Sequence, residues 1–121
     1  MKVLVPTAGV GPAKKNAEYI LEIARKLSAE VLVIHITDPL EEDVDQSALD
    51  EFVEWGAKKD VTVTTKVIEG NIVPLIVDTA IDEQASLIIM GASKGRIVAE
   101  WVVTQVMDKC TVPVVIIPYQ F

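Results

Sequence analysis

Ser86-Leu-Ile-Ile-Met-Gly-Ala-Ser-Lys-Gly-Arg96 is the stretch that decides the fold of this 121-residue chain. Its apolar run, Leu87 to Met90, stops abruptly at Gly91, and a second glycine follows at Gly95. After the second glycine, valines recur at helical spacing. This order indicates a buried parallel strand that ends in a glycine loop, from which a helix begins.

The glycine loop between this strand and the helix suits an anion. Backbone N–H groups at a helix start have no partner within the helix and carry the positive end of its dipole. Lys94 and Arg96 add two positive charges there, in a chain of formal net charge −7. The two glycines also allow the chain simply to turn out of the sheet, so the pattern leaves a binding role and a purely structural role open.

The composition predicts a single soluble domain, residues 1–121, with an aliphatic core. Half of the residues are hydrophobic and only 5% are aromatic. The 18 acidic residues against 11 basic ones disfavour nucleic acids and anionic membranes as partners, since both need a basic face. No apolar stretch reaches a membrane-spanning length, and a strand rather than a signal peptide opens the sequence. We therefore expect a cytoplasmic protein, in which the single cysteine, Cys110, forms no internal disulfide.

Strand and helix patterns alternate along the whole sequence. Strands are expected at residues 2–7, 30–37, 60–69, 86–90 and 112–118, with helices beginning near residues 12, 47, 71 and 96. Strands separated by helices need crossover connections, which give a parallel sheet with helices on both faces. Ligands of such sheets bind outside the carboxyl ends of the strands, where the strand order reverses. Residues 7–11 and 91–95 both lie at such ends.

Receiver domains and flavodoxin-like electron carriers share this alternation but fit the sequence less well. A receiver needs acidic residues at the end of its first strand, where this chain has Pro6-Thr7-Ala8. A flavodoxin-like carrier needs a Ser/Thr-rich phosphate loop and aromatic residues around the flavin. This chain has Gly9-Val10-Gly11 at that place and few aromatic residues.

Five segments, in order and along the full length, resemble the universal stress protein family. They are Val3-Leu-Val-Pro-Thr7, Glu30-Val-Leu-Val-Ile-His-Ile-Thr-Asp-Pro39, Ile68-Glu-Gly-Asn71, Ile88-Ile-Met-Gly-Ala-Ser-Lys-Gly95 and Val112-Pro-Val-Val-Ile-Ile-Pro118. The chain looks like a short, divergent member. The resemblance implies the adenine-nucleotide α-hydrolase-like fold, with a five-stranded parallel sheet in the order 3-2-1-4-5, and a homodimer.

The resemblance also implies where an adenine nucleotide would bind. Family members of the nucleotide-binding kind hold adenine and ribose with the loop after the first strand and the end of the second, and the phosphates with the loop after the fourth. Carried over by position, the adenosine side takes Pro6, Thr7, Ala8, Ile36, Met90 and Gly91, and the phosphate side takes Lys94, Gly95 and Arg96. No metal or catalytic residue is implied.

Two departures from the family pattern affect this site. Ala8 stands where nucleotide binders carry an aspartate, and its methyl group accepts no hydrogen bond. In the phosphate motif of the family, two residues separate the first glycine from the second. A Gly-Ser or Gly-Thr pair follows further along the chain. Here three residues separate Gly91 from Gly95, and Glu100-Trp101 stands where the Gly-Ser is expected.

These observations lead to two main hypotheses of function. The first is a non-catalytic homodimer, a small regulatory or stress-response module for an unidentified protein partner, with the standard ATP site lost or altered. The second is a binding protein for ATP or AMP with a shortened phosphate loop. A slow ATPase is least favoured, because no group is placed to activate a water, and no cofactor is required. His35, the only histidine, is predicted to be a satisfied interior residue.

The last strand predicts how two copies would assemble. In the order 3-2-1-4-5 it is an edge, and its interface candidates are apolar: Val112, Val114, Val115, Ile116 and Ile117. An edge this apolar invites pairing, which the same strand of a second copy would satisfy and close at two. Pro113 and Pro118 confine the pairing to the residues between them. The alternative is a monomer in which residues 119–121 cover their own edge.

Overall fold

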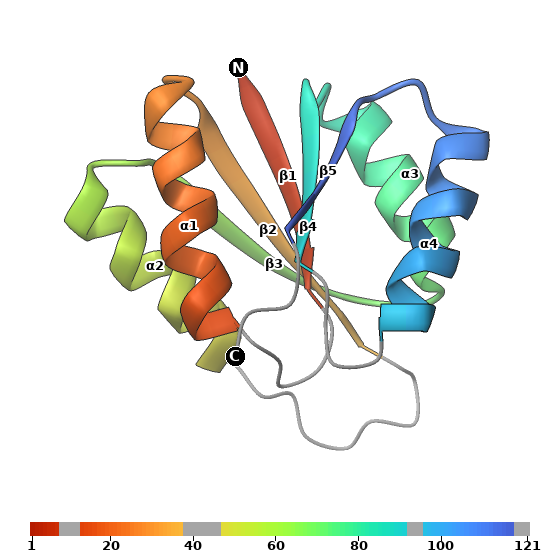
Figure 1. Cartoon of the computed structure of the whole chain (residues 1–121), viewed down its shortest axis with the longest axis horizontal. Helices are drawn as coiled ribbons and strands as arrows, with labels where there is room; N and C mark the ends of the chain where they lie inside the picture. Colours follow the sequence, from red (N-terminus) through yellow and green to blue (C-terminus); the bar gives the residue numbers. More distant parts are fainter. Residues whose placement is uncertain (8–12, 38–46, 92–95, 118–121) are drawn as a thin grey trace.

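The computed structural model describes residues 1–7, 13–37, 47–91 and 96–117, with only the backbone described at 13–15, 47–48 and 96–100. The strands are β1 (Lys2–Thr7), β2 (Glu30–Thr37), β3 (Val63–Glu69), β4 (Leu87–Gly91) and β5 (Val114–Ile117). The helices are α1 (Ala13–Lys26), α2 (Ser47–Lys59), α3 (Ile72–Asp82) and α4 (Arg96–Lys109). The five strands form one parallel sheet in the order β3-β2-β1-β4-β5, which confirms the expected fold (Figure 1).

Two helical layers cover the sheet, with α1 and α2 on one face and α3 and α4 on the other (Figure 1). Because strand side chains alternate between faces, β1 supplies both cores. Val3 and Val5 pack in the cluster that contains α1 and α2, and Leu4 packs in the cluster that contains α3 and α4. None of these three side chains is more than 1% exposed. None of the helices in the described ranges is long and apolar enough to span a membrane.

The pairing of β1 marks the place where the strand order reverses. β1 pairs with β2 along all six of its residues, from Lys2 to Thr7. With β4 it pairs only at Val3 and Leu4, so the two strands are unpaired toward their carboxyl ends. The chain places β2 and β3 on one side of β1 and β4 and β5 on the other. The carboxyl ends of β1 and β4 are therefore the topological switch point, the usual ligand position in such sheets.

Two strands are shorter than the sequence predicts. The third begins at Val63 rather than at residue 60, and β5 covers Val114–Ile117 rather than residues 112–118. Val112 and Pro113 precede β5, because Pro113 has no N–H to give to the ladder. The Pro113 carbonyl still accepts a hydrogen bond from Ile88 N at 2.9 Å. Pro118 lies outside the described residues.

Ion pairs join β1, β3 and the residue that follows α3. Glu83, which follows α3, accepts hydrogen bonds from Lys66 Nζ of β3 at 2.8 Å and from Lys2 Nζ of β1 at 3.0 Å. The hydrogen bond from Lys66, followed by that from Lys2, lowers the pKa of the Glu83 carboxyl from 4.5 to about 2. The carboxylate therefore stabilises the folded chain as long as it is ionised.

Replacing Glu83 with glutamine is expected to lower stability in a pH-dependent way. The folded pKa of Glu83, about 2, is below its ordinary value, so its contribution is complete above the unfolded pKa and is lost as pH falls toward 2. In urea unfolding, wild type should exceed Glu83→Gln at pH 7, and the difference should vanish near pH 2. The control is Glu69→Gln, since the exposed Glu69 makes no ion pair among the described residues. A difference that is equal at both pH values would contradict this role of Glu83.

Candidate functional site

Five of the residues predicted to bind a nucleotide lie together at the carboxyl ends of three adjacent strands. Pro6 and Thr7 end β1, Ile36 is the penultimate residue of β2, and Met90 and Gly91 end β4. Ala8, Lys94 and Gly95 lie outside the described residues. Arg96 is the first residue of α4, and its side chain is not among those described.

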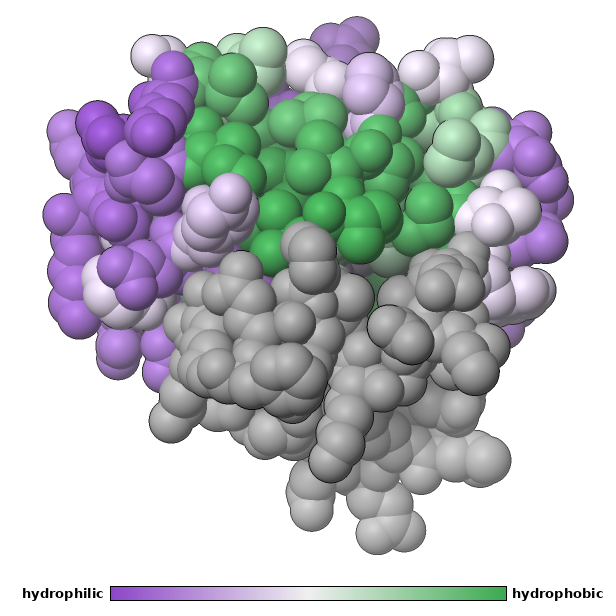
Figure 2. Space-filling view, viewed as in Figure 1, coloured by the Kyte–Doolittle hydropathy of each residue, from purple (hydrophilic) through white to green (hydrophobic). Residues whose placement is uncertain are grey.

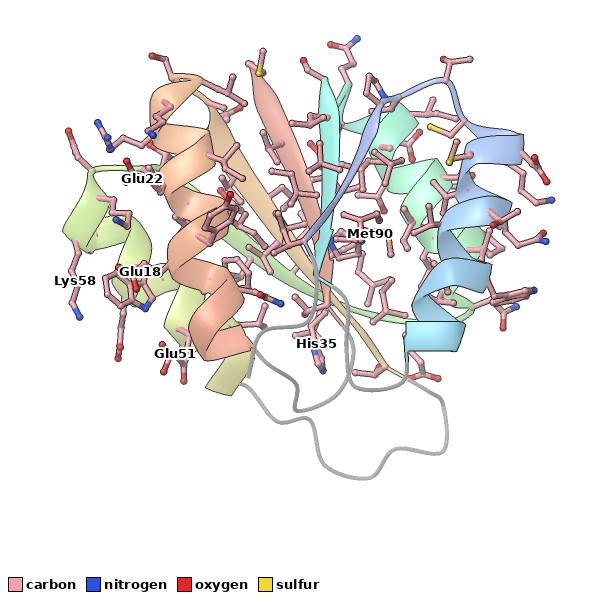
Figure 3. The ribbon with its side chains drawn as sticks, in the orientation of Figure 1. Glu18, Glu22, His35, Glu51, Lys58 and Met90 are labelled. Carbon is pink, nitrogen blue, oxygen red and sulfur yellow. The ribbon has the colours of Figure 1, made fainter. Side chains whose placement is uncertain are left out.

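The two faces of the sheet divide these residues into two groups. Ile36 and Met90 belong to the core cluster on the α3 and α4 side, where they are 7% and 8% exposed. On the α1 and α2 side, Val5 and Val33 belong to the other cluster. Two residues further along the same strands, Thr7 and His35 therefore lie on the α1 and α2 side. Figure 3 shows His35 at the carboxyl end of the sheet and Met90 higher, between the sheet and α4.

The hydroxyl of Thr7 contacts His35 and the residue before it on β2. Thr7 Oγ1 lies 3.3 Å from the carbonyl oxygen of Ile34 and 3.1 Å from His35 Nδ1. Which of Thr7 Oγ1 and His35 Nδ1 donates in this contact depends on the tautomer of the imidazole.

His35 is fully buried, and its Nε2 has no hydrogen-bond partner among the described residues. His35 is interior as predicted and its Nδ1 contacts Thr7 Oγ1, whereas no partner of Nε2 lies among the described residues. An unpartnered buried polar atom costs about 1–3 kcal/mol. A group of this kind at a switch point calls for a partner that the described protein groups do not supply.

Asn16 on α1 supplies a second atom of this kind, which the sequence analysis missed. Its side chain is 4% exposed, and its Oδ1 has no partner among the described residues. A Cβ atom at Gly91 would overlap Asn16 Nδ2 and lie 3.2 Å from Asn16 Cγ. Gly91 is thus needed for the close approach of α1 to β4. The available signal was spacing, because Asn16 lies four residues before Ile20 on the buried face of the helix.

Among the described residues, Asn16 Oδ1 and His35 Nε2 are buried side-chain atoms without a hydrogen-bond partner, and Thr7 Oγ1 contacts the imidazole. Within the described ranges, no group of three histidine, cysteine or acidic residues could hold a metal ion.

A parallel sheet in the order β3-β2-β1-β4-β5 with helices on both faces defines a doubly wound α/β protein. The model of the universal stress protein family matches residues 1–118, and the chain belongs to this family. The resemblance seen in the sequence is confirmed. A comparison with curated proteins finds no match.

Solved structures of similar fold cover nearly the whole chain. A universal stress protein in complex with cAMP is 19% identical, with a TM-score of 0.76, and the match covers 99% of this chain and 98% of that one. The universal stress protein from Archaeoglobus fulgidus in complex with dAMP is 21% identical, with a TM-score of 0.68 and 97% of each chain covered. A family protein from Arabidopsis thaliana with AMP bound is 19% identical, with a TM-score of 0.74, covering 99% of this chain and 92% of that one.

Adding a methyl group at Gly91 is expected to destabilise the chain through Asn16. Gly91→Ala should cost about 1–3 kcal/mol, because the new Cβ meets the Asn16 amide in a packed site. In an Asn16→Ala background the same substitution should cost less, by roughly 1 kcal/mol or more. Urea unfolding of both single variants and the double variant measures this coupling.

The matched control for this coupling is a second asparagine. Asn71, exposed at the start of α3, can be changed to alanine without touching Gly91. The costs of Asn71→Ala and Gly91→Ala should add. Additive costs for Asn16→Ala and Gly91→Ala as well would show that the Asn16 amide does not determine the glycine at 91.

Proposed function

We propose that this universal stress protein family member is a non-catalytic homodimer that binds an adenine nucleotide through its nucleoside part. The observation that carries the proposal is a pair of buried polar atoms near the switch point, Asn16 Oδ1 and His35 Nε2, which have no hydrogen-bond partner among the described residues. Adenosine has the matching chemistry, since its ribose hydroxyls and its 6-amino group are hydrogen-bond donors. The similar structures with cAMP, dAMP and AMP support the ligand class.

The phosphate side of the site argues for a small nucleotide rather than ATP. Three residues separate Gly91 from Gly95, and no Gly-Ser follows them. Glu100 brings a carboxylate to the position of that motif, and Trp101 brings a large side chain that is 56% exposed. Lys94 and Arg96 leave enough positive charge for one phosphate, so a nucleoside monophosphate fits the altered motif best.

The nucleophiles and bases of the chain also favour a binding role over catalysis. The only histidine uses Nδ1 to hold Thr7. The only cysteine, Cys110, lies after α4 and accepts a hydrogen bond from Val112 N at 3.5 Å. Among the residues that the structure describes, neither is paired with a second group in the way that activates a water or a nucleophile. The competing function is a partner-binding homodimer that takes no nucleotide.

Thermal unfolding with and without nucleotide tests the proposal. AMP in large excess should raise the melting temperature, since a ligand at one hundred times its Kd adds about 2.7 kcal/mol. ATP at the same concentration should raise it less, because the phosphate motif is short. No shift with AMP, cAMP or ATP would favour the partner-binding function. A larger shift with ATP, abolished by Lys94→Ala and by Arg96→Ala, would instead favour a rebuilt phosphate loop.

The homodimer is proposed to form through β5. This edge strand has no charged residue, and Val115 and Ile116 are 36% and 41% exposed. Figure 2 shows apolar residues gathered on this side of the molecule, where β5 is the nearest strand in Figure 1. The opposite edge, β3, carries the exposed Lys66 and Glu69, which oppose edge-to-edge pairing.

The structure refines which predicted interface residues can reach a second copy. Val112 and Val114 are half-buried against the α3 and α4 core, so they offer part of their surface. Ile117 is 3% exposed and packs with α1, and it therefore contributes backbone rather than side chain. Val115 and Ile116 are the side chains most available to the partner.

Val115→Lys is expected to convert the dimer to a monomer, because two lysines would meet across the two-fold axis without partners. Sedimentation at micromolar concentration measures the change. Val67→Lys on β3 is the matched control, since Val67 is 43% exposed on the other edge and should leave the dimer intact. A wild-type monomer, or a dimer unaffected by Val115→Lys, would show that β5 is not the interface.

A further inference from the structure

A cleft lies where β2 and β3 begin, at the other end of these strands from the candidate nucleotide site. Its volume is about 380 Å³, which is within the usual range of small-molecule sites. Both α1 and α2 end beside it, on the side of the molecule where the strands start (Figure 1). We propose that this cleft binds a basic amino acid, a ligand with one carboxylate and two cationic groups joined by an aliphatic chain.

The floor of the cleft is apolar and its rim is polar. Ala24, Ala29 and Val61 line the cleft and are buried, so they form the floor. The other lining residues are exposed and polar, and they form the rim: Arg25, Ser28, Glu30, Asp60 and Thr62. The aliphatic chain of a ligand can cover such a floor while its charged ends stay at the rim, as lysine stems do on protein surfaces.

The charged groups of the rim are one cation and two anions. Arg25 of α1 supplies the cation, and Glu30 of β2 and Asp60, which follows α2, supply the two carboxylates. A basic amino acid carries the opposite set, one carboxylate and two cationic groups, so it balances every charge of the rim. A metal ion would match the carboxylates alone, and the described ranges contain no group of three histidine, cysteine or acidic residues to hold one.

The two carboxylates of the rim keep most of their capacity for a cation. Asp60 makes no ion pair within the described part of the chain. Glu30 Oε1 lies 3.9 Å from Lys2 Nζ, but this nitrogen is closer to Glu83 Oε2, at 3.0 Å. Each carboxylate can therefore accept a charge-assisted hydrogen bond from an ammonium group of the ligand.

Arg25 keeps part of its hydrogen-bonding capacity for the ligand carboxylate. Its Nε and Nη2 donate to Glu22, which also accepts from Lys59 Nζ at 3.1 Å. A guanidinium has five N–H donors, and Nη1 of Arg25 has no partner among the described residues. Glu22 thus holds the guanidinium at the rim and leaves one of its nitrogens for the ligand.

Calorimetric titration of the full chain at low salt tests the proposal with three probes of matched chain length. They are lysine, norleucine, which lacks the side-chain ammonium group, and cadaverine, which lacks the carboxylate. Wild type should bind lysine, and it should bind each of the other two roughly fivefold more weakly, as expected when one exposed charge pair is lost. Arg25→Gln should bind lysine and cadaverine equally well, because it has no cation for the carboxylate.

The carboxylates are tested by Asp60→Asn, with Glu30→Gln as a second variant. The backbone of Asp60 is left-handed, with a φ of 57°, and asparagine adopts this conformation readily, so the turn is kept. Either variant should bind lysine roughly fivefold more weakly than wild type does. The matched control is Asp50→Asn, which removes the same charge from the exposed first turn of α2 and should leave the affinity for lysine unchanged.

Three results would overturn the proposal. The first is that wild type binds no lysine. The second is that norleucine or cadaverine binds wild type as tightly as lysine does, because the charges of the rim would then not select the ligand. The third is that Asp60→Asn and Asp50→Asn weaken lysine equally, since the effect would then come from net charge alone. None of these results depends on AMP, so the nucleotide function and this proposal stand or fall separately.

Discussion

Burial of the central strand β1 on both faces is the constraint on which the rest of the structure depends. Val3, Leu4 and Val5 are at most 1% exposed, so neither face of the strand can be left to water. Parallel neighbours need helical crossovers, and crossovers in both directions from β1 give one helical layer for each face. Because the crossovers run in both directions from β1, the switch point lies beside β1. Polar side chains lie at this point.

The two ends of the sheet illustrate different uses of polar groups. Near the start of β1, Glu83 is held by Lys2 and Lys66, and every charge of this set has a partner. At the carboxyl ends, Asn16 and His35 each keep one polar atom without a partner among the described residues. Satisfied polar groups stabilise a fold, and buried groups without a partner call for an explanation.

The sequence predicts β1 and β2 to the residue, because apolar runs there are bounded by strong turn residues. β5 begins at Val114 and not at the predicted residue 112. The reason is the orientation of Pro113, whose carbonyl accepts from Ile88 of β4, and the sequence does not reveal that orientation. Thr7, Met90 and Gly91 were assigned to the site by position from the resemblance to the family. Asn16 was not, because its role depends on a glycine far away in the chain that only the folded sheet brings against it.

Gly91 is shared by the candidate ligand site and by the ladder that leads to the edge strand. One side of it contacts Asn16 of the candidate ligand site, and in the ladder it is in register with Ile117 of the edge strand β5. Only β4 separates the switch point from the proposed dimer edge. Suppose that ligand binding shifts β4 and thereby changes the association constant of two copies. Association of the two copies must then change the ligand affinity by the same factor. Occupancy by the nucleotide would then depend on how much of the protein the cell contains.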